Sequence, residues 1–172
     1  MLCFRSVLLV LIFCGLGGCT QFNLVSTSSL SSGYTSPEIS SIVVSKDARK
    51  LYLFSGKKMI RAYRVELGFN PIGDKKVRGD GKTPEGKYYI DRKNSKSRFF
   101  LSLGISYPNK RDQAEAKSLG KSAGGDIFIH GQDSKPHFFN SDWTAGCIAL
   151  RNKDIREIYS VVDIGTPIFI RP

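Results

Sequence analysis

The chain has 172 residues, of which 41% are hydrophobic and 24% charged, and this composition excludes a disordered or collagen-like protein. Its 26 Lys and Arg residues outnumber 15 Asp and Glu, which gives a net charge of +11. Such an excess attracts polyanions, namely nucleic acid, anionic lipid or acidic cell-wall polymer, and the charge by itself does not choose among them.

Residues 1–19 have the pattern of a secretory signal peptide. One arginine precedes an apolar run that ends at Leu16, and two glycines then supply the small residues of a cleavage site. The run is too short to span a membrane comfortably. The segment 16–19 also resembles a bacterial lipobox, in which the cysteine, here Cys19, is lipidated. We therefore expect export to the periplasm with a lipid anchor, and Thr20 after the cysteine favours the outer membrane.

Export leaves one cysteine available for chemistry. Cys3 and Cys14 would leave with the signal peptide and Cys19 would carry lipid, so Cys147 has no partner for a disulfide. An unpaired thiol in an oxidising compartment has to be either buried or used. This favours a functional Cys147 over a packing one.

A linker and one domain follow the signal peptide. Residues 20–37 contain six Ser, three Thr and no charge, which is typical of a flexible linker. The domain is expected over residues 38–172. Its segments rich in β-branched and aromatic residues predict strands at 41–45, 50–55, 58–68, 87–91, 98–104, 126–131 and 166–170.

A loop and two helices complete the predicted elements. Residues 68–86 hold five Gly and two Pro, so they cannot form one regular element. Asn109 is a candidate N-cap for a helix over 110–119 that stops at Gly120. Asn152 is a candidate N-cap for a second helix over 153–163, whose apolar face comprises Ile155, Ile158, Tyr159 and Val162. The sum predicts a mainly β domain, a sandwich or barrel, with one or two peripheral helices.

The two histidines occupy different contexts. His130 ends a predicted strand and precedes Gly131, a place where catalytic groups are often found. His137 lies in a predicted loop and is interpreted as an incidental surface side chain. We expect no metal and no cofactor, because two His and one Cys without close spacing fall short of usual ligand sets. Zinc held by His130, His137 and Cys147 is the minor alternative.

Cys147 follows Gly146 in a predicted turn. Composition alone leaves a buried inert cysteine about as plausible as a catalytic one. A thiol attacks as the thiolate, and a nearby imidazole such as His130 can take its proton. Consecutive amides at a glycine-containing turn can donate to the oxyanion that forms on an attacked carbonyl. The strand-end His130 therefore favours the catalytic interpretation.

His130-Gly131 followed by Thr144-Ala145-Gly146-Cys147 resembles the signature of the L,D-transpeptidase (YkuD) family. The resemblance covers about residues 40–172 and extends to the stretches GDGKTPEGKYYI, RFFLSLGISYPN and DIFIHG, the last two being similar to the family's YafK-like branch. It implies a mainly β sandwich, an L,D-transpeptidase-like fold. It also implies that Cys147 is the nucleophile and His130 its base, with Thr144 at the motif's hydroxyl position. Gly146 and Cys147 would supply amides to the oxyanion, with Gly131 in support.

In this family the cysteine attacks the carbonyl of the third stem residue of peptidoglycan, usually meso-diaminopimelate, and expels the terminal D-Ala. An amine then resolves the thioester and forms a cross-link or an attached lipoprotein, or water hydrolyses it. The resemblance thus implies stem peptides, and possible attachment of a wall lipoprotein, as partners. The positive surface fits their carboxylates, and the export signal disfavours nucleic acid.

Two departures from the family pattern concern the pocket. Many members have His before Gly-Cys, where this chain has Ala145, and Arg two residues after Cys, where it has Ala149. Arg151 is the candidate substitute, with a helix-flanking role as its alternative, and Tyr107 is a second candidate substrate contact. The YafK-like branch also has Ala at the second position and is associated with releasing a lipoprotein from peptidoglycan. Hydrolysis therefore stays open beside transfer, and a non-catalytic wall-binding module is the rival class.

Overall fold

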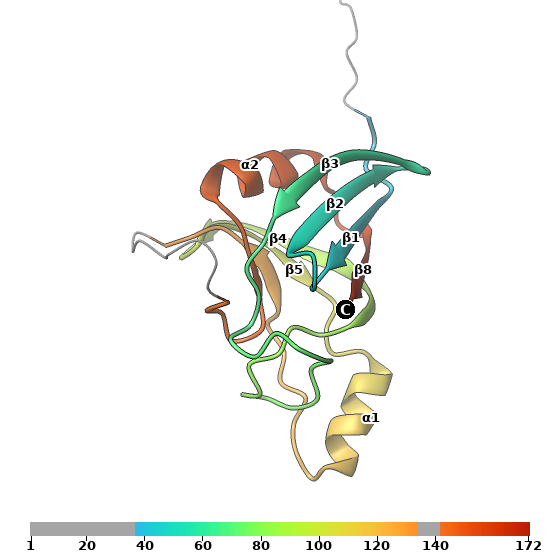
Figure 1. Ribbon diagram of the computed structural model, residues 1–172, viewed down its shortest axis with the longest axis vertical. Helices are drawn as coiled ribbons and strands as arrows, with labels where there is room; N and C mark the ends of the chain where they lie inside the picture. Colours follow the sequence, from blue (N-terminus) through green and yellow to red (C-terminus); the bar gives the residue numbers. More distant parts are fainter. Residues whose placement is uncertain (1–36, 134–141) are drawn as a thin grey trace, which may run out of the picture. The chain divides into compact units, whose positions relative to one another are not determined.

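The structure is a computed structural model that describes residues 37–133 and 142–172 (Figure 1). The expected signal peptide, the lipidation site Cys19, nearly all of the predicted linker and His137 lie outside the described residues. Within the described ranges, no helix is long and apolar enough to cross a membrane.

Most of the regular elements in the described residues are strands. In chain order they are β1 (Ser41–Ser45), β2 (Lys50–Ser55), β3 (Lys58–Arg64), β4 (Gly86–Ser97), β5 (Phe100–Ile105), α1 (Lys110–Ser118), β6 (Phe128–His130), β7 (Ile148–Ala149), α2 (Asn152–Val161) and β8 (Pro167–Arg171). The predicted mainly β fold with two helices is confirmed.

All eight strands belong to one sheet with the order β3-β2-β1-β8-β4-β5-β6-β7. The long strand β4 joins its two halves: Gly86–Tyr89 pairs with β8, and the stretch from Ile90 onward pairs with β5. An irregularity in the register after Ile90 marks the change of partner, and such bulges bend a strand.

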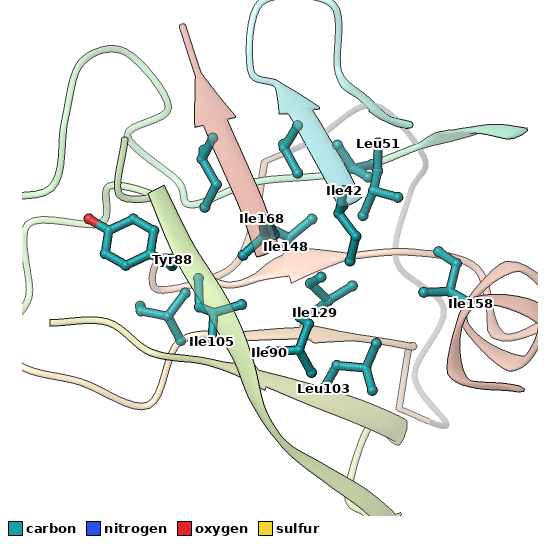
Figure 2. Close-up of a cluster of buried hydrophobic side chains, with 14 of the residues drawn as sticks. Ile42, Leu51, Tyr88, Ile90, Leu103, Ile105, Ile129, Ile148, Ile158 and Ile168 are labelled. Carbon is teal, nitrogen blue, oxygen red and sulfur yellow. The ribbon is translucent and has the colours of Figure 1, made fainter. Parts of the chain in front are cut away.

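The hydrophobic core lies between the two halves of the sheet (Figure 2). Ile42, Leu51 and Ile168 point inward from one half and meet Leu103 and Ile129 of the other, all at most 1% exposed. Burial alternates along β1 and β8, as expected for strands with one buried and one solvated face. This is the sandwich arrangement expected from the sequence.

Two predicted strands differ clearly from the structure in length, and one strand was not predicted. β4 extends to Ser97, well past the predicted end at residue 91, because its second half also pairs with β5. The side chains of this half are polar and mostly solvated, so they leave no apolar pattern in the sequence. β3 ends at Arg64 instead of residue 68. β7, with two residues, is too short to leave a periodic pattern in the sequence.

Helix α1 forms as predicted, and α2 forms with a different cap. Asn109 accepts from the N–H groups of Arg111 and Asp112 and forms a capping box with Asp112. The prediction that Asn152 caps α2 is wrong: the N-cap residue is Arg151, and the Asn152 Oδ1 accepts from Gln132 N–H at 2.7 Å. The side chain of Asn152 therefore ties α2 to the segment after β6 instead of capping the helix.

The predicted apolar face of α2 covers the core. Ile155, Ile158 and Val162 are fully buried, and Tyr159 is partly buried against the same cluster. The helix packs on β5, and β5 pairs with β6, the strand that ends at His130.

Candidate active site

The predicted catalytic pair comes from two short neighbouring strands. β6 ends at His130, β7 begins directly after Cys147, and the two strands pair in parallel with His130 opposite Ala149. Cys147 and His130 consequently line one pocket of about 290 Å³, together with Phe99, Phe128 and Arg98 among others. The structure brings together the two residues that the sequence singled out.

A backbone carbonyl orients the imidazole of His130. The ring is 3% exposed, and its Nδ1 lies 2.6 Å from the carbonyl oxygen of Gly131. A carbonyl only accepts, so Nδ1 carries the proton in the neutral ring and the lone pair lies on Nε2. The ring also packs against Phe99 at 4.5 Å and edge-on to Trp143 at 5.8 Å between centroids. These contacts fix the tautomer that a general base needs.

Gly131 is required for close packing around this histidine. A Cβ at position 131 would lie 2.5 Å from Asn152 Oδ1 and 2.8 Å from the carbonyl oxygen of Phe99. Any side chain here would push β6 away from α2 and from the aromatic wall of the pocket. The predicted supporting role of Gly131 thus has a steric basis.

The Cys147 thiol is half-buried and hydrogen-bonded to backbone. Its Sγ accepts from Phe128 N–H at 3.4 Å and donates to the carbonyl oxygen of Asp126 at 3.6 Å. Burial raises the pKa of the Cys147 thiol above its ordinary value, although Phe128 N–H and the nearby Lys75 cation partly oppose the rise. The resting thiol is therefore protonated at neutral pH.

Thr144 braces the turn that carries the thiol. Its Oγ1 donates to the carbonyl oxygen of Cys147 at 2.7 Å and accepts from Gly146 N–H at 3.1 Å. Of the two amides expected to face an oxyanion, that of Gly146 is thus already engaged. The N–H of Cys147 has no acceptor among residues 37–133 and 142–172, and neither has that of Ala145.

Two carboxylates hold the start of this turn, and no sequence pattern marked them. Asp142 accepts from Leu67 N–H at 2.8 Å and pairs with Arg49 Nη2 at 2.7 Å. The buried Glu66 accepts from Trp143 Nε1 at 2.6 Å. Both contacts join residues far apart in sequence, so only the fold brings them together.

A second pocket, of about 260 Å³, is also lined by Cys147. Its lining includes Lys75, Arg78, Gly124, Asp126 and Ala145, together with Cys147 itself. Cys147 and Asp126 line both pockets. No sequence pattern marked Lys75 or Arg78 as a site residue, because both lie in an irregular loop, and Asp126 was noted only as the first residue of the DIFIHG stretch.

Arg151 and Tyr107, the candidate substrate contacts, line neither of these two pockets. Arg151 pairs with Asp154 at 2.8 Å in the first turn of α2, which corresponds to the helix-flanking alternative. Tyr107 is 5% exposed and donates to the carbonyl oxygen of Ala123 at 3.0 Å. Ala149 is buried in β7, where its N–H donates to the carbonyl oxygen of Glu66 at 2.8 Å.

No three His, Cys, Asp or Glu side chains in the described part of the chain are grouped so that they could hold a metal ion. His137, one of the three residues of the zinc alternative, is outside that part.

Comparison with known proteins decides the family. The model of the L,D-transpeptidase catalytic domain, YkuD, matches residues 40–170. The chain belongs to the L,D-transpeptidase (YkuD) family. This confirms the resemblance seen in its motifs. The chain is 29% identical to the L,D-transpeptidase family protein YafK of Escherichia coli (strain K12) over 127 residues, which are 71% of this chain and 45% of YafK. The predicted similarity to the YafK-like branch is therefore confirmed as well.

Solved structures agree with this assignment. The helical cell shape determining protein Pgp2 of Campylobacter jejuni superposes with a TM-score of 0.61 at 28% identity, over 77% of this chain and 47% of Pgp2. Bd1075 of Bdellovibrio bacteriovorus gives 0.58 at 26% identity, over 78% and 48%. An L,D-transpeptidase of Stackebrandtia nassauensis, at 14% identity and a TM-score of 0.54, shares the fold. The chain spans about half the length of YafK, Pgp2 and Bd1075.

Proposed function

We propose that this family member is a peptidoglycan-modifying cysteine L,D-transpeptidase that acts on the meso-diaminopimelate carbonyl of stem peptides. The observation that carries the proposal is the pocket shared by Cys147 and His130, with the imidazole held in the tautomer that accepts a proton at Nε2. Family membership supports the substrate class, and the name of Pgp2 supports a role in the cell wall that determines cell shape.

The first half of the reaction forms a thioester. His130 Nε2 takes the proton of the Cys147 thiol as sulfur attacks the carbonyl carbon. The negative charge that develops on the carbonyl oxygen is stabilised by the unengaged N–H of Cys147. The tetrahedral intermediate then collapses, the C–N bond to the terminal D-Ala breaks, and the imidazolium returns its proton to the leaving amine.

The second half decides between transfer and hydrolysis. His130 deprotonates either the acceptor amine or a water molecule, which attacks the thioester and releases the Cys147 thiolate to be reprotonated. Hydrolysis, including release of a lipoprotein from diaminopimelate, is the second candidate. The similarity to YafK and the alanine at position 149 favour it, because the resemblance associates that branch with such a release.

The same proposal includes a cellular location. The chain is exported by the signal peptide 1–19, lipidated at Cys19, and tethered by residues 20–37 to a catalytic domain of residues 38–172. The lipid anchor, in the outer membrane, would keep the domain in the periplasm, within reach of peptidoglycan. Incorporation of labelled palmitate into wild-type protein and its loss in Cys19→Ala tests this part.

The test of the reaction is Cys147→Ala on purified peptidoglycan, with muropeptides separated and weighed by mass spectrometry. We expect at least about a 10³-fold loss of product formation, since no other thiol lines the pocket. Lys57→Ala, in the exposed turn between β2 and β3 and away from the pocket, is the control variant and should form product as the wild type does. Unchanged product formation by Cys147→Ala would contradict the proposal that Cys147 is the nucleophile.

The products distinguish the candidates. Links between two diaminopimelate residues identify transfer, and trimmed stems or freed lipoprotein without such links identify hydrolysis. Retained binding to the wall with no product from the wild type identifies the non-catalytic module.

A further inference from the structure

The pocket of about 260 Å³ beside Cys147 contains two cations in different states. Lys75 is 3% exposed and is neutralised by Asp80, whose Oδ1 lies 2.8 Å from its Nζ. Arg78 is exposed, and no carboxylate pairs with its side chain in the described part of the chain. All 15 Asp and Glu residues of the protein lie within that part, so the lack of a partner for Arg78 extends to every acidic side chain.

The loop that carries Arg78 is folded around one partly buried carboxylate, that of Asp80. Asp80 accepts from the backbone N–H groups of Lys76 at 2.8 Å, Val77 at 3.0 Å and Lys82 at 3.0 Å, in addition to the Lys75 ammonium. Four donors converging on one side chain hold the backbone on both sides of Arg78. The loop is therefore organised before any ligand arrives, which reduces the ordering cost of binding.

A second segment fixes the same loop against the rim of the pocket. Arg78 N–H donates to the carbonyl oxygen of Ser122 at 2.7 Å. A Cβ on Gly124 would lie 3.3 Å from the Cα of Arg78, and Gly124 has a φ of +83°. Glycine at 124 thus permits the close approach of the two segments. The position of the Arg78 backbone is determined, whereas its guanidinium remains available.

The remaining acid of the pocket does not cancel this charge. Asp126 has a side chain that is 86% exposed, and it pairs with Arg92 at 3.1 Å. One unneutralised guanidinium, that of Arg78, therefore remains in the pocket of about 260 Å³. Its planar fork of donors matches a carboxylate in a bidentate arrangement, which a lysine cannot reproduce.

We propose that Arg78 binds a free carboxylate of the stem peptide in this pocket and thereby places the scissile carbonyl at Cys147. This inference rests on the proposed function. The proposal concerns the two carboxylates that flank the scissile bond and supply the same chemistry: the terminal carboxylate of D-Ala and the side-chain carboxylate of diaminopimelate.

The experiment measures equilibrium binding of a synthetic tetrapeptide to the full-length Cys147→Ala protein, which binds without turnover. The peptide is compared with two analogues in which either the D-Ala or the diaminopimelate side-chain carboxylate is an amide. We expect Arg78→Ala to weaken binding of the acid peptide about 10- to 30-fold, the range of one charge-assisted bidentate contact. Arg78→Lys should recover part of the loss, and Lys57→Ala should bind as the parent does.

The amides identify the carboxylate through a double-mutant cycle. The analogue whose amide replaces the bound carboxylate should bind the parent about 10-fold more weakly and lose nothing further in Arg78→Ala. The Arg78→Ala variant must first unfold at the same temperature as the parent protein, which shows that it is folded. If this variant then binds the acid peptide as tightly as the parent does, the proposal is overturned. It is also overturned if both amides remain as sensitive to Arg78→Ala as the acid.

Turnover separates this inference from the proposed function. Binding that depends on Arg78, in a wild-type protein that forms no product from the same peptide, would leave the carboxylate subsite standing while the cysteine chemistry fails. In an active protein, the same substitution should raise KM by about the factor seen in binding and change kcat much less, since the contact exists before the reaction.

Discussion

The Cys147 thiol is held in a state that suits an enzyme waiting for its substrate. Its half-buried position and the Phe128 N–H and Asp126 carbonyl contacts keep the sulfur aligned without an ion pair at rest. A protonated thiol is also less prone to oxidation, which proceeds through the thiolate. If Cys147 is the proposed nucleophile of an exported protein, this state would protect it from oxidation until the proposed base His130 removes the proton during attack.

We expect the alkylation of Cys147 by iodoacetamide to rise with pH to a midpoint above about 8.5, the ordinary thiol value. Burial raises the pKa of this thiol, so the folded protein holds its proton to higher pH than the unfolded chain. Peptide mapping by mass spectrometry measures the rate at Cys147 alone. The same residue in denaturant is the control, and a folded midpoint near pH 7 or below would show a resting thiolate instead.

The sign of this shift also affects stability. Because the unfolded chain releases the thiol proton first, the folded state keeps its full stability below about pH 8.5 and loses part of it as the pH rises further through the folded pKa.

The proximity of Cys147 and His130 could be predicted from the sequence, because their order matches the family signature and the three other cysteines lie at or before residue 19. Arg78 could not, since a basic chain offers many arginines and only the fold shows that this one lines the pocket of about 260 Å³ without a carboxylate partner. The Gly146 amide was assigned to the oxyanion from the motif alone. The structure shows it bonded to Thr144, a contact that depends on the rotamer of one hydroxyl side chain.

At the scale of elements, the catalytic turn and the glycine-rich loop pack backbone against backbone. A Cβ on Gly68 would collide with the carbonyl oxygen of Gly81 and lie 3.1 Å from the Cα of Gly146. Gly146 itself has a φ of +132°, and a Cβ there would lie 2.6 Å from the carbonyl oxygen of Lys82. The loop 68–86 therefore packs directly against the turn that carries Cys147 and supports it.

Gly146→Ala should destabilise the protein more than Gly165→Ala, by about 1 kcal/mol or more. Both positions have a positive φ, which costs a non-glycine residue about 1–3 kcal/mol. A Cβ at Gly165, with a φ of +94°, meets nothing within 4 Å, so only Gly146→Ala adds a collision with backbone. Chemical denaturation measures both free energies of unfolding, and equal losses would contradict the packing described for the turn.

The strands that position the site were predictable in kind but not in length. Alternating apolar residues identified β1, β2 and β8, because each has one buried face. The second half of β4 escaped prediction because its polar side chains are solvated. β7 escaped because two residues carry no period, although β7 sets the spacing of Cys147 and His130.

For the whole molecule, acid stability should depend on Asp80. Burial acts to raise the pKa of this carboxyl, but the Lys75 ammonium and the N–H groups of Val77, Lys76 and Lys82 outweigh it and hold the pKa below its usual range. The stabilisation is present above the unfolded value, about pH 3.9, and disappears as the pH falls through the lower folded value.

Asp80→Asn should therefore be less stable than the wild type at pH 6, with the difference shrinking between about pH 4 and pH 2. Urea unfolding at a series of pH values measures this. Asp47→Asn, which removes the same charge from the exposed turn after β1, controls for net charge. A difference that stays constant with pH would show that Asp80 acts only through its shape.

The place of β8 in the sheet governs the order in which the molecule can be completed. β8 follows the other seven strands in the sequence, yet it lies between β1 and β4, so that Ile168 pairs with Ile42 on one side and Tyr88 on the other. Until residues 167–171 are available, β3-β2-β1 and β4-β5-β6-β7 are two separate ribbons with no ladder between them. Completion of the sheet therefore waits for its last strand, which would suit the proposed export, since an exported chain has to stay unfolded while it crosses a membrane.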